Sequence, residues 1–373
     1  MTVDHEQLLR DLESSTGPLG LLTMQATRTA FLLARRFPGR LKALYSAEHG
    51  FFGALAPGEN AADARHPFLG LPICSLYGAH RKPTPGMLAG VSRMVIDLCD
   101  IGVRCYTYLA TLKNTLEACA EAHIPVTVLD RPIPLGDVVD GPLVEPGRES
   151  FVAPIGVPLC HGMTPGECAL WIREAKLDLD LRVVRLEGWS HARREPWANF
   201  MPPSPAIRSW DSAALYPATV FTEAYPAVDC DRQGALAFRV LGAPWLDARA
   251  VMEDLEPGLS ACGVEMRPYR YACAAGASAG SVLDGILLST SPAAPYRPVR
   301  AGVLILAALL RRHAEEMAAG ARPEWLAKLM GTETVGAALR GGDLEGLFHS
   351  WDVGRAAYLP TRVNLYAEGV DRL

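Results

Sequence analysis

Short leucine-rich and β-branched runs alternate with segments of helical periodicity through the first half of the chain, and this alternation restricts the fold most strongly. We expect strands near residues 19–23, 41–45, 72–76, 93–97, 124–129 and 182–186. Segments 27–36, 109–122 and the one that starts at Thr164-Pro165 have the apolar spacing or start signals of helices. Strands that alternate with helices are typical of a parallel sheet with crossover helices. The sequence therefore predicts an α/β fold with a Rossmann-like sheet and flanking helices.

A break in this periodicity predicts the domain organisation. It lies between Glu195 and Pro205, where the run Pro202-Pro203-Ser204-Pro205 excludes both a helix and a central strand. A chain of 373 residues is long enough for two hydrophobic cores. We expect a Rossmann-like catalytic domain over residues 1–195 and a smaller α+β auxiliary domain over residues 196–373.

Charge and hydropathy exclude several partners. The formal net charge is -5, and Lys and Arg are scattered along the chain, so we expect neither nucleic acid nor a membrane as a partner. The longest apolar run, residues 301–310, is too short for a bilayer span and predicts a core helix. Residues 1–15 lack the pattern of a secretory signal, and the nine cysteines form no Cys-x-x-Cys pair. We expect reduced thiols and a cytoplasmic protein.

Common cofactor and nucleophile motifs are absent or poorly placed. The chain has no Gly-x-Gly-x-x-Gly after its first strand, no Walker A loop and no His-Glu-x-x-His, so no metal or organic cofactor is implied. Residues 276–280 match the Gly-x-Ser-x-Gly motif of serine hydrolases, with Ser278 in the nucleophile position. The small residues before this motif favour a loop over a strand, so a serine hydrolase is the weakest hypothesis.

Ionisable residues gather just after the ends of three predicted strands. Glu48-His49 follows the second strand, the segment from Asp100 to Arg104 follows the fourth, and Asp130-Arg131 follows the fifth. Ligands of open parallel sheets bind at the carboxyl ends of the strands, so these loops predict one shared site. A carboxylic acid in a partly dry cleft can act as a general acid, and Glu48 suits that role.

Structural roles explain some of these residues equally well. Asp130 and Arg131 are as readily a helix cap and a structural ion pair as they are ligand-binding groups. Tyr106, beside the Arg104 loop, suits either a sugar face or a core. His161 directly precedes a predicted helix and either reaches the cleft or supports the start of that helix.

Many short segments resemble segments of one known family, and they occur along the chain in the same order as in that family. The resemblance is to the exo-β-N-acetylmuramidase (NamZ-type) family of bacterial peptidoglycan-recycling glycosidases, and it covers most of residues 17–247. The matching segments are 46–50 (Ser-Ala-Glu-His-Gly), 58–59, 70–72, 75–78, 81–85 (Arg-Lys-Pro-Thr-Pro), 100–108, 130–132, 140–142, 161–164, 202–205, 216–217 and 242–245.

The resemblance implies a fold, an activity and a site. It implies a Rossmann-like domain joined to a smaller C-terminal domain, with the active site between them. Enzymes of this family remove N-acetylmuramic acid from the non-reducing end of muropeptide-derived glycans, and the glutamate regarded as their catalytic acid falls on Glu48. The resemblance also implies that His49 and a further set of residues bind the substrate, namely Arg104, Tyr106, Asp130, Arg131 and His161.

One segment departs from the family pattern. The family reads Phe-Glu-Gly-Thr-Asn-x-Ser-Glu-Gly-Arg-Gly-Thr where this chain has residues 222–234, and only Glu223 and Arg232 match as substrate-binding residues. Asp229 or Asp231 can replace the missing second carboxylate. A family asparagine is replaced by Met24.

The leading hypothesis is therefore an exo-acting glycoside hydrolase that takes small muramyl saccharides. The alternative is a catalytically silent homologue that binds a cell-wall sugar or a partner protein.

Overall fold

A seven-stranded sheet forms the centre of the first half of the computed structural model, which describes residues 2–56, 58–193, 195–197 and 199–367. The strands are parallel except for the last in the order β10-β7-β6-β2-β3-β5-β4. Their bounds are β10 Leu181–Val184, β7 Val126–Leu129, β6 Arg93–Asp97, β2 Leu19–Thr23, β3 Leu41–Ser46, β5 Pro72–Ser75 and β4 Ala64–Arg65. The predicted α/β fold class is confirmed.

Helices cover both faces of this sheet because both faces are apolar. Leu19 and Leu21 of β2 pack in one cluster with α1 (His5–Glu13) and α2 (Thr29–Arg36). Leu22 of β2 and Ile96 of β6 belong to the cluster on the other face, with α4 (Tyr108–Glu121) and α5 (Pro165–Lys176). A sheet covered on both faces holds its strands rigidly, so the loops at their carboxyl ends have a fixed base.

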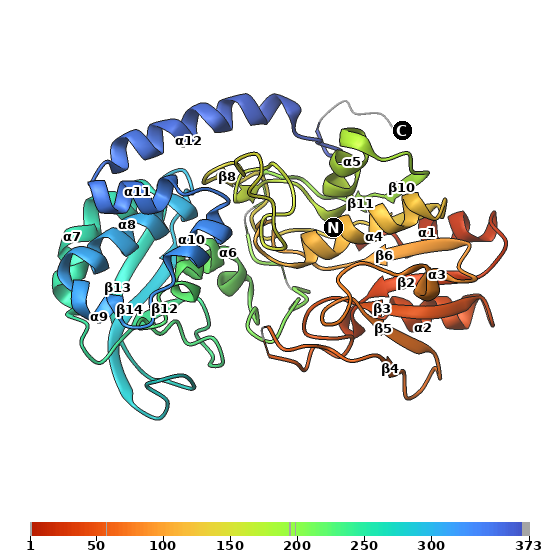
Figure 1. Ribbon diagram of the computed structural model, residues 1–373, viewed down its shortest axis with the longest axis horizontal. Helices are drawn as coiled ribbons and strands as arrows, with labels where there is room; N and C mark the ends of the chain where they lie inside the picture. The colour runs from red at the N-terminus through yellow and green to blue at the C-terminus, as the bar shows by residue number, and fades with distance from the viewer. Residues whose placement is uncertain (1, 57, 194, 198, 368–373) are drawn as a thin grey trace.

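The second half is a smaller α+β unit beside the first (Figure 1). Its antiparallel sheet has the order β12 (Val240–Gly242), β14 (Val282–Thr290), β13 (Val264–Ala272). Its helices are α6 Trp210–Thr219, α7 Ala248–Ala261, α8 Pro298–Arg312, α9 Ala314–Ala318, α10 Pro323–Met330, α11 Thr334–Gly341 and α12 Leu344–Tyr358. Figure 1 shows α12 running back over the molecule towards α5 of the first half, where the Leu365 amide donates to Glu167 of that helix.

Short elements complete the described chain. They are β1 Thr2–Val3 paired with β11 Leu186–Glu187, β8 Val139–Asp140 paired with β9 Cys160–His161, α3 Pro85–Leu88, and the 3₁₀ turns η1 Gln25–Thr27, η2 Val220–Glu223 and η3 Leu359–Thr361. The apolar run 301–310 lies inside α8, which packs on α6 and α7. No helix among the described residues has the length and apolarity needed to cross a membrane.

Three features differ from the sequence-based expectation. The predicted strand over residues 182–186 is divided into β10, which joins the large sheet, and β11, which pairs with β1. Pro217 lies inside α6, a helix that the sequence did not indicate. Residues 276–280 form the connection between β13 and β14, so no helix follows Ser278 as a nucleophile elbow requires.

Candidate active site

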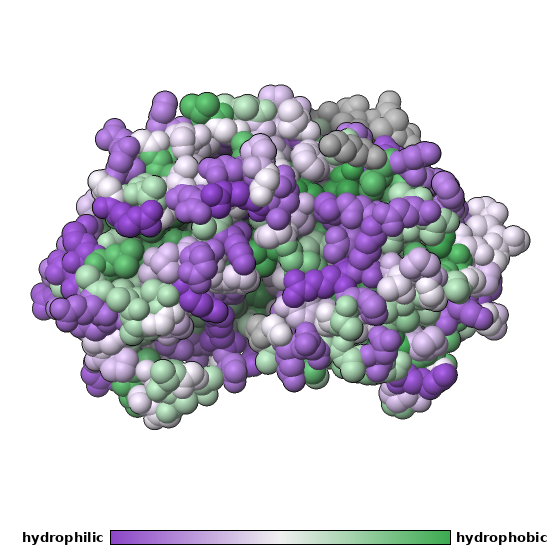
Figure 2. Space-filling view, in the orientation of Figure 1, coloured by the Kyte–Doolittle hydropathy of each residue, from purple (hydrophilic) through white to green (hydrophobic). Residues whose placement is uncertain are grey.

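A cavity of about 510 Å³ lies between the two halves of the molecule. Loops after β3, β5 and β6 line it from the sheet side, and η2, the loop after it and α10 line it from the other side. In the space-filling view the surface is hollowed between the halves, with hydrophilic residues along the border of the hollow (Figure 2). The predicted position at the carboxyl ends of parallel strands thus agrees with where this cavity lies.

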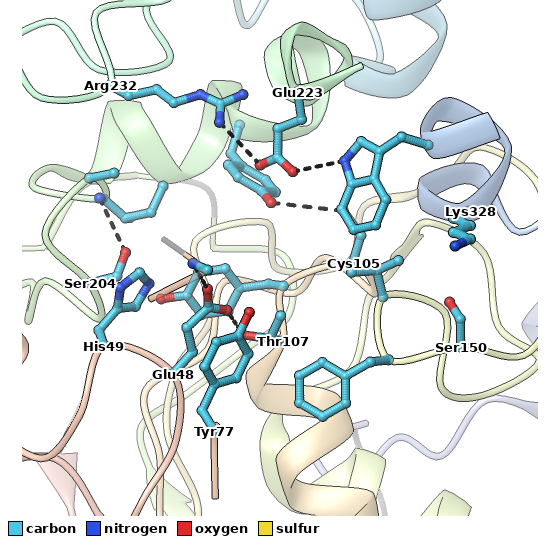
Figure 3. A pocket seen from close by; sticks show the side chains of 18 of the residues that line it. Glu48, His49, Tyr77, Cys105, Thr107, Ser150, Ser204, Glu223, Arg232 and Lys328 are labelled. Carbon is cyan, nitrogen blue, oxygen red and sulfur yellow. Dashed lines mark hydrogen bonds and ion pairs between the residues drawn. The ribbon is translucent and has the colours of Figure 1, made fainter. Parts of the chain in front are cut away.

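Glu48 enters the cavity from the loop after β3. His49 and Gly50 have φ angles of 70° and 71°, which turn the chain sharply directly after this glutamate. The Glu48 side chain is mostly buried, with the residue only 7% exposed. Its Oε1 accepts a hydrogen bond from the Gly58 amide at 2.7 Å, and its Oε2 accepts one from the Thr107 hydroxyl at 2.6 Å (Figure 3).

Tyr77, from the loop after β5, brings its phenol close to the Glu48 carboxylate. Burial, together with the negative Glu48 carboxylate, raises the pKa of the Tyr77 phenol to about 12. The phenol therefore stays protonated and uncharged at neutral pH beside Glu48. A carboxylate has about four lone-pair positions. The Gly58 and Thr107 donors, one on each oxygen, fix its orientation and leave positions free for a proton that can be transferred.

His49 is beside Glu48 in the cavity lining. Its Nδ1 lies 2.9 Å from the main-chain carbonyl oxygen of Leu55. A carbonyl only accepts, so Nδ1 carries the proton and, in the neutral ring, Nε2 has the free lone pair. This expected binding residue is therefore held in one tautomer.

Glu223 brings a second carboxylate to the cavity, from the turn η2. Its Oε2 accepts a hydrogen bond from the Trp325 indole N–H at 3.3 Å, and its Oε1 lies 3.8 Å from Arg232 Nη1 (Figure 3). Arg232 is itself held by Thr222, whose hydroxyl lies 3.2 Å from Nη2. The two carboxylates of the lining thus come from opposite halves of the molecule.

Aromatic rings form much of the remaining lining. Tyr106 meets Tyr216 edge to face, and Tyr216 meets Phe238 in the same way, with centroids 6.2 Å and 4.8 Å apart. Burial raises the pKa values of the Tyr106 and Tyr216 hydroxyls well above the usual value, so both rings are neutral. Apolar faces with polar tips suit the faces and hydroxyls of a pyranose.

Arg104 does not line the cavity, which corrects the expectation that it binds substrate. It is fully buried, and its guanidinium donates to four main-chain carbonyls, those of Pro142, Val157, Leu329 and Met330 at 2.7–3.1 Å. Burial lowers its pKa to about 10, which still leaves it charged at neutral pH. Its donors join two loops to the carboxyl end of α10.

Asp130, Arg131 and His161 are also outside the lining, because the protein itself uses their polar atoms. Asp130 accepts from the Thr164 hydroxyl and the Gly166 amide at the start of α5, both at 2.7 Å. Arg131 makes a bidentate ion pair with Asp97 at 2.6 and 2.8 Å. His161 is 1% exposed, and its Nδ1 accepts from the Met163 amide. The structural alternatives therefore describe two of these residues: Asp130 caps a helix, and Arg131 forms an ion pair.

Neither aspartate proposed as a second carboxylate lines this cavity. Asp229 accepts hydrogen bonds from the Tyr271 hydroxyl at 2.6 Å and from the amide of Asp231 at 2.9 Å. Asp231 in turn accepts from the amide of Leu236 at 2.9 Å. Both carboxylates shape the loop between η2 and β12, and Glu223 alone of the three faces the cavity.

Sequence reasoning missed several lining residues. Tyr77, Arg81 and Thr107 lie within segments that carry the family resemblance, but no pattern assigned them a role. Trp325 and Lys328 come from α10, whose spacing shows only an amphipathic helix. Contacts between segments far apart in the sequence bring these residues to the site. No local signal in the sequence encodes such contacts.

The fold and this cavity define a class, a two-domain α/β protein whose cleft carries two carboxylates among aromatic and cationic side chains. Family models identify it further: the N-terminal model of the exo-β-N-acetylmuramidase NamZ matches residues 17–211 and the C-terminal model matches residues 214–366. The chain belongs to the NamZ exo-β-N-acetylmuramidase family, which confirms the predicted resemblance.

Individual relatives agree with this assignment. The peptidoglycan β-N-acetylmuramidase NamZ of Bacillus subtilis (strain 168) is 34% identical over 271 residues, which are 72% of this chain and 65% of that protein. The matched region thus spans about two thirds of that relative. A solved DUF1343 family protein of Bacteroides fragilis NCTC 9343 is 26% identical, with a TM-score of 0.85 over 97% of both chains. A second such protein of that strain, 22% identical, has the same fold at a TM-score of 0.70 over 93% of both chains.

Proposed function

We propose that this protein is an exo-acting glycoside hydrolase that releases N-acetylmuramic acid from the non-reducing end of small peptidoglycan-derived saccharides. The observation that carries the proposal is the Glu48 carboxyl group, which two donors orient inside the cavity between the halves. Family membership and the B. subtilis relative supply the activity and the substrate class.

In this proposal Glu48 is the general acid. Its protonated form gives the proton to the glycosidic oxygen as the bond to the anomeric carbon breaks. The Gly58 amide and the Thr107 hydroxyl hold the carboxyl group in one rotamer, so the proton is aimed at a single position in the cavity. Such positioning removes part of the entropic barrier to proton transfer.

Glu223 takes the second carboxylate role. Trp325 and Arg232 fix it on the opposite wall, where a carboxylate can stabilise the oxocarbenium-like transition state or act on the attacking group. The 2-acetamido group of the sugar is another candidate for the group that attacks the anomeric carbon. NMR of the first product formed, before the anomers equilibrate, distinguishes retention from inversion.

The charge of the lining favours an acidic sugar. Four cationic side chains line the cavity against the two carboxylates, namely Arg81, Arg232, Arg322 and Lys328. N-acetylmuramic acid differs from N-acetylglucosamine by an ether-linked lactyl group that carries a carboxylate. Cationic groups in a partly dry cleft attract such an anion more strongly than they do in water.

The decisive experiment is release of N-acetylmuramic acid from purified N-acetylmuramyl-β-1,4-N-acetylglucosamine by wild type and Glu48→Gln. We expect release by wild type and a loss of about 10³-fold or more in the variant, because glutamine cannot donate the acidic proton. Saccharide binding without release by wild type would instead identify the silent homologue. Circular dichroism of both proteins checks that the substitution leaves the fold intact.

We further propose the division of labour and the cellular location that the sequence indicated. Residues 1–195 carry the acid, and residues 196–373 close the cleft and bring Glu223. A location in the cytoplasm, where cell-wall fragments are recycled, is supported by the nine cysteines, all of which are free thiols.

A further inference from the structure

Arg81, an exposed residue of the cavity lining, is held by aromatic rings. Its guanidinium carbon lies 4.4 Å from the ring centroid of Phe151 and 5.2 Å from that of Tyr77. The two rings are 5.8 Å apart and tilted, and the Asn114 side chain donates to the Arg81 main-chain carbonyl at 2.7 Å. Contacts with ring faces orient a planar guanidinium without consuming its N–H groups.

The N–H groups of Arg81 are unengaged within the described residues. No hydrogen bond or ion pair to its side chain occurs there, although the side chain lines the cavity. The other two arginines of the lining are occupied: Arg232 donates to Thr222 and pairs with Glu223, and Arg322 donates to the Glu223 main-chain carbonyl. A fixed guanidinium with free donors is prepared for a planar anion.

Tyr77 also sets the position of Arg81 relative to the acid. Tyr77 and Glu48 both line the cavity, and the Tyr77 ring lies under the Arg81 guanidinium. Acid and guanidinium therefore belong to the same part of the lining, with Tyr77 in contact with Arg81 and close to Glu48. In a muramyl sugar the lactyl group is ether-linked at C3, two ring positions from C1, so its carboxylate projects away from the glycosidic oxygen that Glu48 protonates.

We infer that Arg81 forms a carboxylate-binding subsite that selects a sugar acid over its neutral counterpart, through a bidentate contact of its guanidinium with the lactyl carboxylate. This inference rests on the proposed function, because it takes the muramyl substrate from it. Lys328 also lines the cavity, but an ammonium on a flexible chain offers a point charge rather than a two-pronged contact.

Binding of N-acetylmuramic acid and N-acetylglucosamine, measured by calorimetry, tests the inference without turnover. We expect wild type to prefer the acid. Arg81→Met lowers affinity for the acid about tenfold or more and for the neutral sugar much less, so the preference collapses. Arg81→Lys retains part of the preference. Lys82→Met is the matched control, because the neighbouring Lys82 pairs with Glu121 and Glu117 on α4 instead.

Several results overturn the inference. They are an unchanged preference in Arg81→Met, an equal loss of affinity for both sugars, a preference that disappears in Lys328→Met but survives in Arg81→Met, and no binding of either sugar by wild type. The proposed function fails separately. If wild type binds the acid through Arg81 but releases no sugar from the disaccharide, the subsite stands and the hydrolase does not.

Discussion

The Thr107 hydroxyl lies 2.6 Å from Oε2 of Glu48 and donates a hydrogen bond to it. Thr107 is also the N-cap residue of α4, yet its side chain makes no capping hydrogen bond to that helix. A threonine at this position usually caps its own helix, which contributes about 1 kcal/mol. In this protein the hydroxyl instead orients the candidate acid, and helix α4 serves as the base from which it does so.

Replacing Thr107 separates this orienting role from helix stability. We expect Thr107→Val to lower kcat/KM about tenfold, because Glu48 loses one of its two donors, and to change the free energy of unfolding by less than about 1 kcal/mol. Thr107→Ser keeps the hydroxyl and retains most activity. Equal losses in Val and Ser variants, in disaccharide hydrolysis assays, would contradict the role.

Glu223 is expected to matter more than the other acids of its segment. Glu223→Gln should lower kcat about 10²-fold or more, because it removes the negative charge opposite Glu48. Asp229→Asn is the comparison, since Asp229 is bonded to Tyr271 outside this cavity. Steady-state kinetics of both variants decide between the two carboxylates, and a larger loss in Asp229→Asn would refute the assignment.

Arg104 is expected to stabilise the protein without contacting substrate. Arg104→Met leaves four buried carbonyls without their donor, so we expect urea unfolding to show a loss of about 3–5 kcal/mol. Arg104→Lys should recover part of this loss, because one ammonium reaches fewer of the four carbonyls. The KM for the disaccharide should change less than threefold. A large change in KM at unchanged stability would restore the substrate-binding role of Arg104.

Stability in acid should depend on His161. Burial, with Arg104 and Arg362 nearby, lowers its pKa in the folded protein to about 3, below the ordinary value of 6.5. The unfolded chain therefore binds the extra proton first, and stability is lost as pH falls from about 6.5 towards 3. Two pH units below 6.5 this loss is about 2–3 kcal/mol.

His161→Asn tests this dependence, because the amide oxygen can still accept from Met163. We expect the difference in unfolding free energy between pH 7 and pH 4.5 to shrink by about 2 kcal/mol in the variant. Urea titrations at the two pH values measure it. An identical difference in wild type and variant would show that other groups control acid unfolding.

Strand-end reasoning located part of the site. Glu48 follows β3, a strand that the apolar run 41–45 indicated, and it does line the cavity. The same reasoning placed Asp130 and Arg131 at the site, but β7 lies further along the sheet order, two positions from β2 on the side away from β3 and β5. Strand order, which a sequence pattern does not contain, separates these loops.

The C-terminal half was harder to predict because its local signals conflict. Pro268 argues against a strand, yet β13 contains it at the edge of its sheet, where a missing N–H costs no ladder bond. Pro217 argues against a helix, yet α6 is buried on all sides and packs on α8. Tertiary packing overrides such local preferences when enough apolar surface is buried.

The sequence by itself determined the α/β class, most strands of the large sheet, the family and Glu48, because apolar periodicity and contiguous motifs are local properties of the chain. Only the tertiary structure decided which polar groups face the cavity. Arg104 and Glu223 show this: the charged guanidinium lies inside the protein on four carbonyls, while the glutamate reaches the cavity through contacts with Trp325 and Arg232. A side chain's partners depend on contacts between segments far apart in sequence, and these form only when the two halves pack together.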